Sequence, residues 1–263
     1  KIKIASIPTK SKSHQVDIYD VLHPSMNRLL YLNSMLHTAS YGMESHYEAI
    51  VHPAMMAHPN PRRIVLVGGD SILGGKVVRE LLKHENVEHV NVMLMMEEED
   101  DDEFQSIADE YMEGWNDCSD LIGLEWNHED ESDSFKCLEE DRVEVFLGDV
   151  VQWFDRGSFH VSPVPTDHDN DDSEDNDDDE DSSDDSSDDE EQEPFDLIFI
   201  NALNDDLVKS SYKALSKDGI MVLHLGTSPF NRDSPDAIAK PNRDNIITTI
   251  TALDFQSWHI YEE

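Results

Sequence analysis

Short, continuously apolar runs separated by helical patterns dominate the chain after Pro61. A run without polar interruption is typical of a strand that is buried on both faces of a parallel sheet. The predicted strands are residues 64–67, 90–96, 142–147, 197–200, 220–225 and 255–261, and the predicted helices are residues 76–84, 104–111, 207–215 and 244–253. A Gly-rich turn is expected over residues 68–75. These repeated βα units predict an α/β fold with a doubly wound, mostly parallel sheet, whose ligands bind at the carboxyl ends of the strands.

The sequence before Pro61 has a different pattern. Residues 14–39 alternate polar and apolar positions in short runs, which predicts a small β-meander. Residues 43–57 present apolar side chains on one helical face, and Pro53 is expected to kink or interrupt this helix. We therefore predict an N-terminal β-domain over residues 13–41 and a Rossmann-like domain over residues 42–263.

Charge is distributed unevenly along the chain. The 263 residues carry 59 Asp and Glu against 19 Lys and Arg, a formal net charge of −40. All seven residues of 97–103 are acidic, as are 18 of the 27 residues of 167–193, and we interpret both segments as polyanionic insertions. Residues 157–194 are expected to form a disordered surface loop, because self-repelling acidic sequence cannot bury a core. The simplest interpretation is a solvated loop without a specific role; the alternatives are a binding segment for basic proteins or polyamines, and a phosphorylation target.

Composition excludes several classes of protein. Such a negative surface repels phosphate backbones, so nucleic-acid binding is not expected. No apolar run approaches the ~20 residues that a membrane-spanning helix needs. Cys118 and Cys137 show no CxxC motif and no histidine at ligand spacing, so we expect neither a disulfide framework nor a zinc site, and we predict a reduced, cytoplasmic location. His46, His52 and His58 are six residues apart and point ~120° apart on a helix, so no metal site is predicted there.

Motifs along the chain resemble one known family. The sequence HPNPRRIVLVGG at residues 58–69 and VRELLKH at residues 78–84 resemble the polyamine aminopropyltransferases, the spermidine and spermine synthase family. Further matches to that family's motifs are residues 17–18, 30–33, 48, 87–90, 147–149 and 195–198. The resemblance implies a small N-terminal β-domain on a Rossmann-like domain of the S-adenosylmethionine-dependent methyltransferase type. The family's closing antiparallel strand does not follow Glu263 and the chain opens on Lys1, so we expect a fragment of a longer protein.

The same resemblance implies an activity. The family transfers an aminopropyl group from decarboxylated S-adenosylmethionine, a co-substrate and not a permanently bound cofactor, to a diamine or polyamine. Its members usually form dimers or tetramers, and a homodimer is the expectation for this chain. This transfer needs a nucleoside cradle, an acidic groove for a cationic amine, and a carboxylate that accepts the proton of that amine.

The resemblance assigns the nucleoside cradle to five residues, and the amine site to three more. Asp149 falls where the family carboxylate accepts from the adenine amino group; from the residues alone, a helix N-cap is the preferred interpretation. The family's ribose-binding acid falls at Leu94, with Glu97 shortly after it. The cradle residues are Gly68, Gly69, Asp70, Glu97 and Asp149, and the substrate-binding residues are His46, Tyr47 and Glu48. His46 stands where the family has Tyr.

The catalytic segment departs from the family pattern. The family's D-(S/T)-(S/T)-D-P aligns with residues 201–205, so both acidic positions become Asn, at Asn201 and Asn204. An amide accepts no proton at neutral pH and neutralises no ammonium. Asp205 and Asp206 are the candidate substitutes for the base. Three hypotheses remain open: a divergent aminopropyltransferase, a catalytically silent binding or regulatory homologue, and another S-adenosylmethionine-dependent transferase such as a methyltransferase.

Overall fold

The computed structural model describes residues 1–12, 14–23, 26–40, 42–68, 71–95, 97–112, 114–119, 121, 136–156, 193–202, 204–224 and 240–255. The predicted disordered loop at residues 157–194 falls almost wholly outside these ranges, and so does the predicted last strand at residues 255–261. Both stay predictions.

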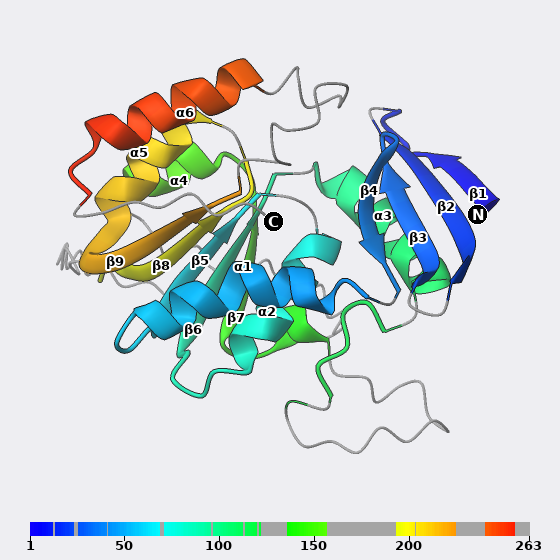
Figure 1. The fold of residues 1–263 in the computed structure, drawn as a ribbon, viewed down its shortest axis with the longest axis horizontal. Helices are drawn as coiled ribbons and strands as arrows, with labels where there is room; N and C mark the ends of the chain where they lie inside the picture. Colours follow the sequence, from blue (N-terminus) through cyan, green and yellow to red (C-terminus); the bar gives the residue numbers. More distant parts are fainter. Residues whose placement is uncertain are drawn as a thin grey trace, which may run out of the picture.

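A five-stranded parallel sheet forms the centre of the chain (Figure 1). Its strands are β5 (Arg63–Val67), β6 (His89–Leu94), β7 (Val143–Leu147), β8 (Phe195–Ile200) and β9 (Leu215–Leu223), in the order β7-β6-β5-β8-β9. All four pairings are parallel. The doubly wound α/β fold predicted from the continuous apolar runs is therefore confirmed.

Helices cover both faces of this sheet. On one face lie α1 (Glu44–Ala57) and α2 (Ser71–Leu82), with the short 3-10 helix η2 (Cys137–Glu139) beside α2. On the other face lie α4 (Val150–Arg156) and α5 (Asp205–Ala214), with α6 (Lys240–Ala252) packed on α5 (Figure 1). The predicted interruption at Pro53 is wrong, because α1 continues through that residue.

The N-terminal strands form a separate antiparallel sheet in the order β1-β2-β3-β4. The strands are β1 (Ile2–Pro8), β2 (Gln15–His23), β3 (Met26–Leu32) and β4 (Met35–Ala39). The meander predicted over residues 14–39 is present, and β1 adds a strand before it. Val16, Ile18 and Leu30 of this sheet pack against Phe104 and Ile107 of α3 (Glu98–Tyr111). The predicted domain boundary at residues 41 and 42 stays a prediction.

The acidic run at residues 97–103 is not an insertion, and that prediction is wrong. Glu98 to Glu103 form the start of α3, where negative charge is favourable near the partial positive end of the helix dipole. Asp100 is almost fully buried and accepts hydrogen bonds from the backbone N and the Oγ of Ser11, at 3.3 and 2.5 Å. Glu103 accepts from the backbone N of Lys10 at 2.5 Å. These acids attach the turn between β1 and β2 to α3.

The Gly-rich turn predicted over residues 68–75 is shorter than expected, because α2 already begins at Ser71. Two glycines inside α2 permit close packing. A Cβ on Gly74 would lie 3.3 Å from Cγ1 of Val92 in β6, and one on Gly75 would lie 2.7 Å from Oδ1 of Asn116. The glycines after residue 70 therefore serve helix packing and not a phosphate-binding turn.

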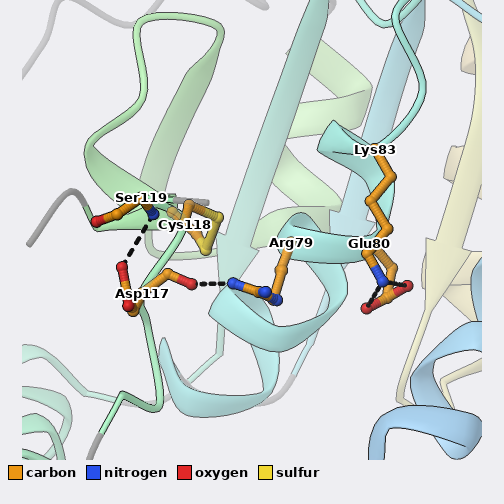
Figure 2. Close-up of a disulfide and its surroundings, with 7 residues drawn as sticks. Arg79, Glu80, Lys83, Asp117, Cys118 and Ser119 are labelled. Atoms are coloured by element: carbon orange, nitrogen blue, oxygen red, sulfur yellow. Dashed lines mark hydrogen bonds and ion pairs between the residues drawn. A yellow bond between two sulfur atoms is a disulfide. The ribbon is translucent and has the colours of Figure 1, made fainter. Parts of the chain in front are cut away.

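A disulfide joins Cys118 to Cys137, so the prediction that no disulfide forms is wrong. The two Cα atoms are 5.0 Å apart and both residues are fully buried against α2. Figure 2 shows that Arg79 of α2 donates to the backbone O of Asp117, and that Asp117 Oδ1 accepts from the backbone N of Ser119 at 2.9 Å. Disulfides are rare in cytosolic proteins, so the bond argues against the cytoplasmic location, which stays a prediction. No helix in the described ranges is long and apolar enough to cross a membrane.

Candidate functional site

The carboxyl ends of three neighbouring strands meet at one edge of the parallel sheet. Asn201 follows β8 and donates its backbone N–H to Val67 O of β5 at 2.8 Å. His224 follows β9 and donates its backbone N–H to Ile200 O of β8 at 2.9 Å. The strand order reverses between β5 and β8, since β6 and β7 lie on one side and β9 on the other. Ligands of doubly wound folds bind at this kind of reversal.

Gly68 follows β5 at this reversal, and its position leaves no room for a side chain. Its φ is +94°, and a Cβ would lie 2.8 Å from the backbone O of Asn201. Only glycine combines that backbone conformation with so close an approach. Glycine at this position thus lets the end of β5 pack closely against the residue that follows β8. Gly69 and Asp70, the next two predicted cradle residues, lie outside the described residues.

Asn201 and His224 are hydrogen-bonded to each other. Asn201 Oδ1 lies 2.6 Å from His224 Nδ1, and the ring of His46 on α1 meets the ring of His224 edge to face, with centroids 6.2 Å apart. His224 is exposed, whereas His46 and Asn201 are half-buried. His224 is not among the site residues predicted from the sequence. The available signal was its position near the carboxyl end of the predicted strand 220–225.

The other catalytic candidates lie in the first turn of α5. Asn204 is the N-cap of that helix: its Oδ1 accepts from the backbone N of Asp206 at 2.9 Å and of Leu207 at 3.2 Å. Asp206 is exposed and pairs with Lys209 at 3.3 Å. Asp205 is half-buried. The side-chain partner that the structure gives Asn201 is His224, and neither aspartate takes that place.

Asp149 follows β7 and caps α4. Its Oδ1 accepts from the backbone N of Gln152 at 3.1 Å, and its Oδ2 accepts from Gln152 Nε2 at 2.9 Å. Asp149 therefore acts as the N-cap of α4, as its interpretation from the residues alone predicted. Asp149 is nevertheless exposed, and a carboxylate has about four lone-pair sites, so capping leaves it able to accept from a ligand as well.

The remaining predicted residues divide between core and surface. Tyr47 is buried, with its hydroxyl 3.2 Å from Thr38 Oγ1 of β4, so it joins α1 to the N-terminal sheet. Glu48 is exposed on α1. Glu97 is exposed at the N-cap of α3 and makes no side-chain capping bond, whereas Leu94 is buried at the end of β6. Of the predicted amine-site residues, His46 has a ring contact with His224.

A second pair of histidines, His52 and His84, lies where α1 and α2 meet, and His52 also contacts Glu80 of α2. His52 Nδ1 is 2.9 Å from His84 Nε2, and His52 Nε2 is 3.2 Å from the buried carboxylate of Glu80, which also binds Lys83 at 2.6 Å. Burial, followed by the charge of His52, lowers the pKa of His84. Within the described ranges no three His, Cys, Asp or Glu side chains are grouped as metal ligands. This cluster is therefore a helix–helix contact.

Part of the chain is similar to proteins of a known family. Residues 43–95 match the model of the spermine/spermidine synthase domain. The polyamine aminopropyltransferase of Pyrococcus abyssi is 37% identical over 99 residues, which cover 38% of this chain and 33% of the relative. Polyamine aminopropyltransferase 1 of Hyperthermus butylicus is 32% identical over 105 residues, covering 40% of this chain and 33% of the relative. The chain thus spans about a third of the length of the curated relatives it matches.

Solved structures show the same fold. Spermidine synthase from Thermotoga maritima superimposes with a TM-score of 0.55 at 16% sequence identity, over 93% of this chain and 64% of that one. A spermidine synthase in complex with the transition-state analogue AdoDATO gives the same score and identity, over 93% of this chain and 65% of that one.

Fold and edge geometry together define the class: a Rossmann-like domain of the methyltransferase type, preceded by an antiparallel sheet. The resemblance predicted from the sequence is confirmed: residues 43–95 match the spermine/spermidine synthase domain, and less than half of the chain is similar to curated polyamine aminopropyltransferases.

Proposed function

We propose that the chain binds the adenosyl nucleoside of decarboxylated S-adenosylmethionine at the carboxyl edge of its parallel sheet, as a divergent aminopropyltransferase. The observation that supports this proposal is the close approach of Gly68, which has no side chain, to the backbone of Asn201 at the strand-order reversal. The polyamine substrate, the homodimer and a basic partner for residues 157–194 are further parts of the proposal, taken from the family resemblance and the acidic sequence.

The ends of β6 and β7 supply a surface suited to adenine. Met95 and Leu147 are large apolar side chains that are 48% and 43% exposed at the ends of adjacent strands. A Cβ on Gly148 would meet nothing within 4 Å, so the space above it is open. Asp149 lies next to it with an exposed carboxylate. Apolar side chains beside a single acceptor fit a flat ring that carries an amino group.

The amine side of the site differs from the family pattern. Asn201 and Asn204 are amides, and both are engaged, one with His224 and the other with the first turn of α5. Neither accepts a proton or balances an ammonium charge. We therefore do not expect aminopropyl transfer to a polyamine through side chains at positions 201 and 204 of this chain. The two neutral amides favour a second candidate function, in which a group is transferred from S-adenosylmethionine to an acceptor that is not a polycation.

A thermal-shift titration tests nucleoside binding. Decarboxylated S-adenosylmethionine, S-adenosylmethionine and methylthioadenosine are compared on the folded protein. A ligand at about 100 times its dissociation constant stabilises by about 2.7 kcal/mol, which corresponds to a shift of about 5–11 °C. The proposal expects the largest shift with the decarboxylated ligand. A larger shift with S-adenosylmethionine would favour the second candidate, and no shift with any of the three would refute nucleoside binding.

Two variants sharpen this test. Asp149→Asn keeps the N-cap of α4, since Asn caps as well as Asp, but removes the acceptor charge, so it should weaken nucleoside binding without unfolding the protein. The double variant Asn201→Asp with Asn204→Asp restores both acidic positions and keeps the cap of α5. It should raise aminopropyl transfer to a polyamine; an unchanged rate would show that the missing carboxylates do not limit the reaction.

A further inference from the structure

Imidazole groups occupy the position at the carboxyl edge where a base is needed. His224 extends from the end of β9 and is exposed, and its ring contacts both Asn201 of β8 and His46 of α1. These three side chains come from three separate elements and meet beside Gly68, whose backbone lies against Asn201. The group thus lies at the strand-order reversal, where the reacting part of a bound nucleoside is expected.

The hydrogen bond to Asn201 fixes the state of the His224 ring. An amide oxygen only accepts, so the 2.6 Å contact requires the hydrogen on Nδ1 of His224. In a neutral imidazole the lone pair is then on Nε2. The edge-to-face contact with His46 holds the ring from the other side. A base held in one tautomer by a neighbouring acceptor is the usual arrangement for a catalytic histidine.

We propose that His224 is the proton acceptor of this site and that Asn201 is its positioning residue, an inference that rests on the proposed nucleoside binding. As the acceptor nitrogen forms its bond to the aminopropyl carbon, the C–S bond of the sulfonium breaks and its electron pair stays on sulfur. The acceptor nitrogen then carries one proton too many, and Nε2 of His224 takes it up. The imidazolium returns this proton to solvent, so charge and atoms balance.

Activity of matched variants tests the role of His224. Release of methylthioadenosine from decarboxylated S-adenosylmethionine is measured with 1,4-diaminobutane and with spermidine as acceptors. His224→Ala should lower kcat by about 10²–10⁴-fold, the range that general-base catalysis contributes, while nucleoside affinity by thermal shift is unchanged. Free imidazole added to His224→Ala should restore part of the lost rate, which a purely structural role would not allow. His89→Gln, at the amino end of β6, is the control and should keep the wild-type rate.

A double-mutant cycle tests the role of Asn201. Asn201→Ala should lower kcat by itself, but the pair Asn201→Ala with His224→Ala should be no slower than His224→Ala alone, because Asn201 acts through the imidazole. Additive losses would overturn the positioning role. A nucleoside-binding wild type that releases no methylthioadenosine, or a His224→Ala variant within about 2-fold of wild type, would overturn the role of His224. Failure of nucleoside binding would instead refute the proposed function.

Discussion

Breaking the Cys118–Cys137 bond should destabilise the parallel-sheet domain, although it removes no heavy atom from the packed core. The bond ties residues 114–119 to η2, and both ends pack on α2. α2 in turn follows the Gly68 turn of the candidate site. Reduction should therefore loosen the support of the helix that follows Gly68 of the candidate site.

The size of the loss follows from the length of the closed loop. The two cysteines are 19 residues apart in sequence. For a loop of this length, the chain-entropy relation gives about 3 kcal/mol of stabilisation by the cross-link. In a protein of this size each kcal/mol moves the melting temperature by about 2–4 °C, so reduction should lower it by about 6–12 °C.

Thermal unfolding of the wild type with and without a phosphine reductant measures this loss directly. The reduced wild type keeps both sulfur atoms, so the difference reports the cross-link and not a cavity. Cys118→Ala with Cys137→Ala is the control, whose melting temperature should not respond to the reductant. A wild-type shift below about 2 °C, or two free thiols found by alkylation and mass spectrometry of protein kept without reductant, would refute the reasoning.

Two further predictions concern α3 and α2. Asp100→Ala leaves the N–H and hydroxyl of Ser11 without their buried acceptor and should lower the free energy of unfolding by about 1–3 kcal/mol in urea denaturation, whereas Asp102→Ala, exposed on the same helix, should change it little. A loss of equal size in both variants would contradict the anchoring role of Asp100. Because burial and the charge of His52 lower the pKa of His84, the folded state binds fewer protons than the unfolded chain, and stability should fall as the pH drops below about 6.5. The urea midpoint of His84→Gln should fall less than that of the wild type between about pH 7.5 and pH 5.5, and equal slopes would exclude this contribution.

The central strands β5 and β8 were predictable because each contains a continuous apolar run. Residues 64–67 and 197–200 lie inside β5 and β8 as the structure has them. The ends of these strands locate the candidate edge, and the resemblance to the family is what assigned Gly68 and Asn201 to the site there. Continuous apolar sequence signals burial on two faces, which few other environments share.

Long-range partners explain what the sequence could not predict. Seven consecutive acids suggested a solvated insertion, yet Asp100 is buried because the turn around Ser11 supplies its donors. Gly75 suggested a turn, yet it lies within α2, where Asn116 leaves no room for a Cβ. Cysteines 19 residues apart carry no local signature of pairing. The role proposed for His224 depends on its hydrogen bond to the amide of Asn201, which follows the neighbouring strand β8.

The adjacency of β5 and β8 also determines when, during folding, the candidate site can exist. Between these two strands the chain passes through α2, β6, α3, β7 and α4. Gly68 and Asn201 therefore meet only after a non-local pairing, the slow kind of event in folding, because a long loop must close first. A nucleoside bound there selects the completed sheet over every partly folded form, and it should slow unfolding more than it speeds folding. Binding at this edge thus reports assembly of the whole sheet, since no local segment of the chain can form it alone.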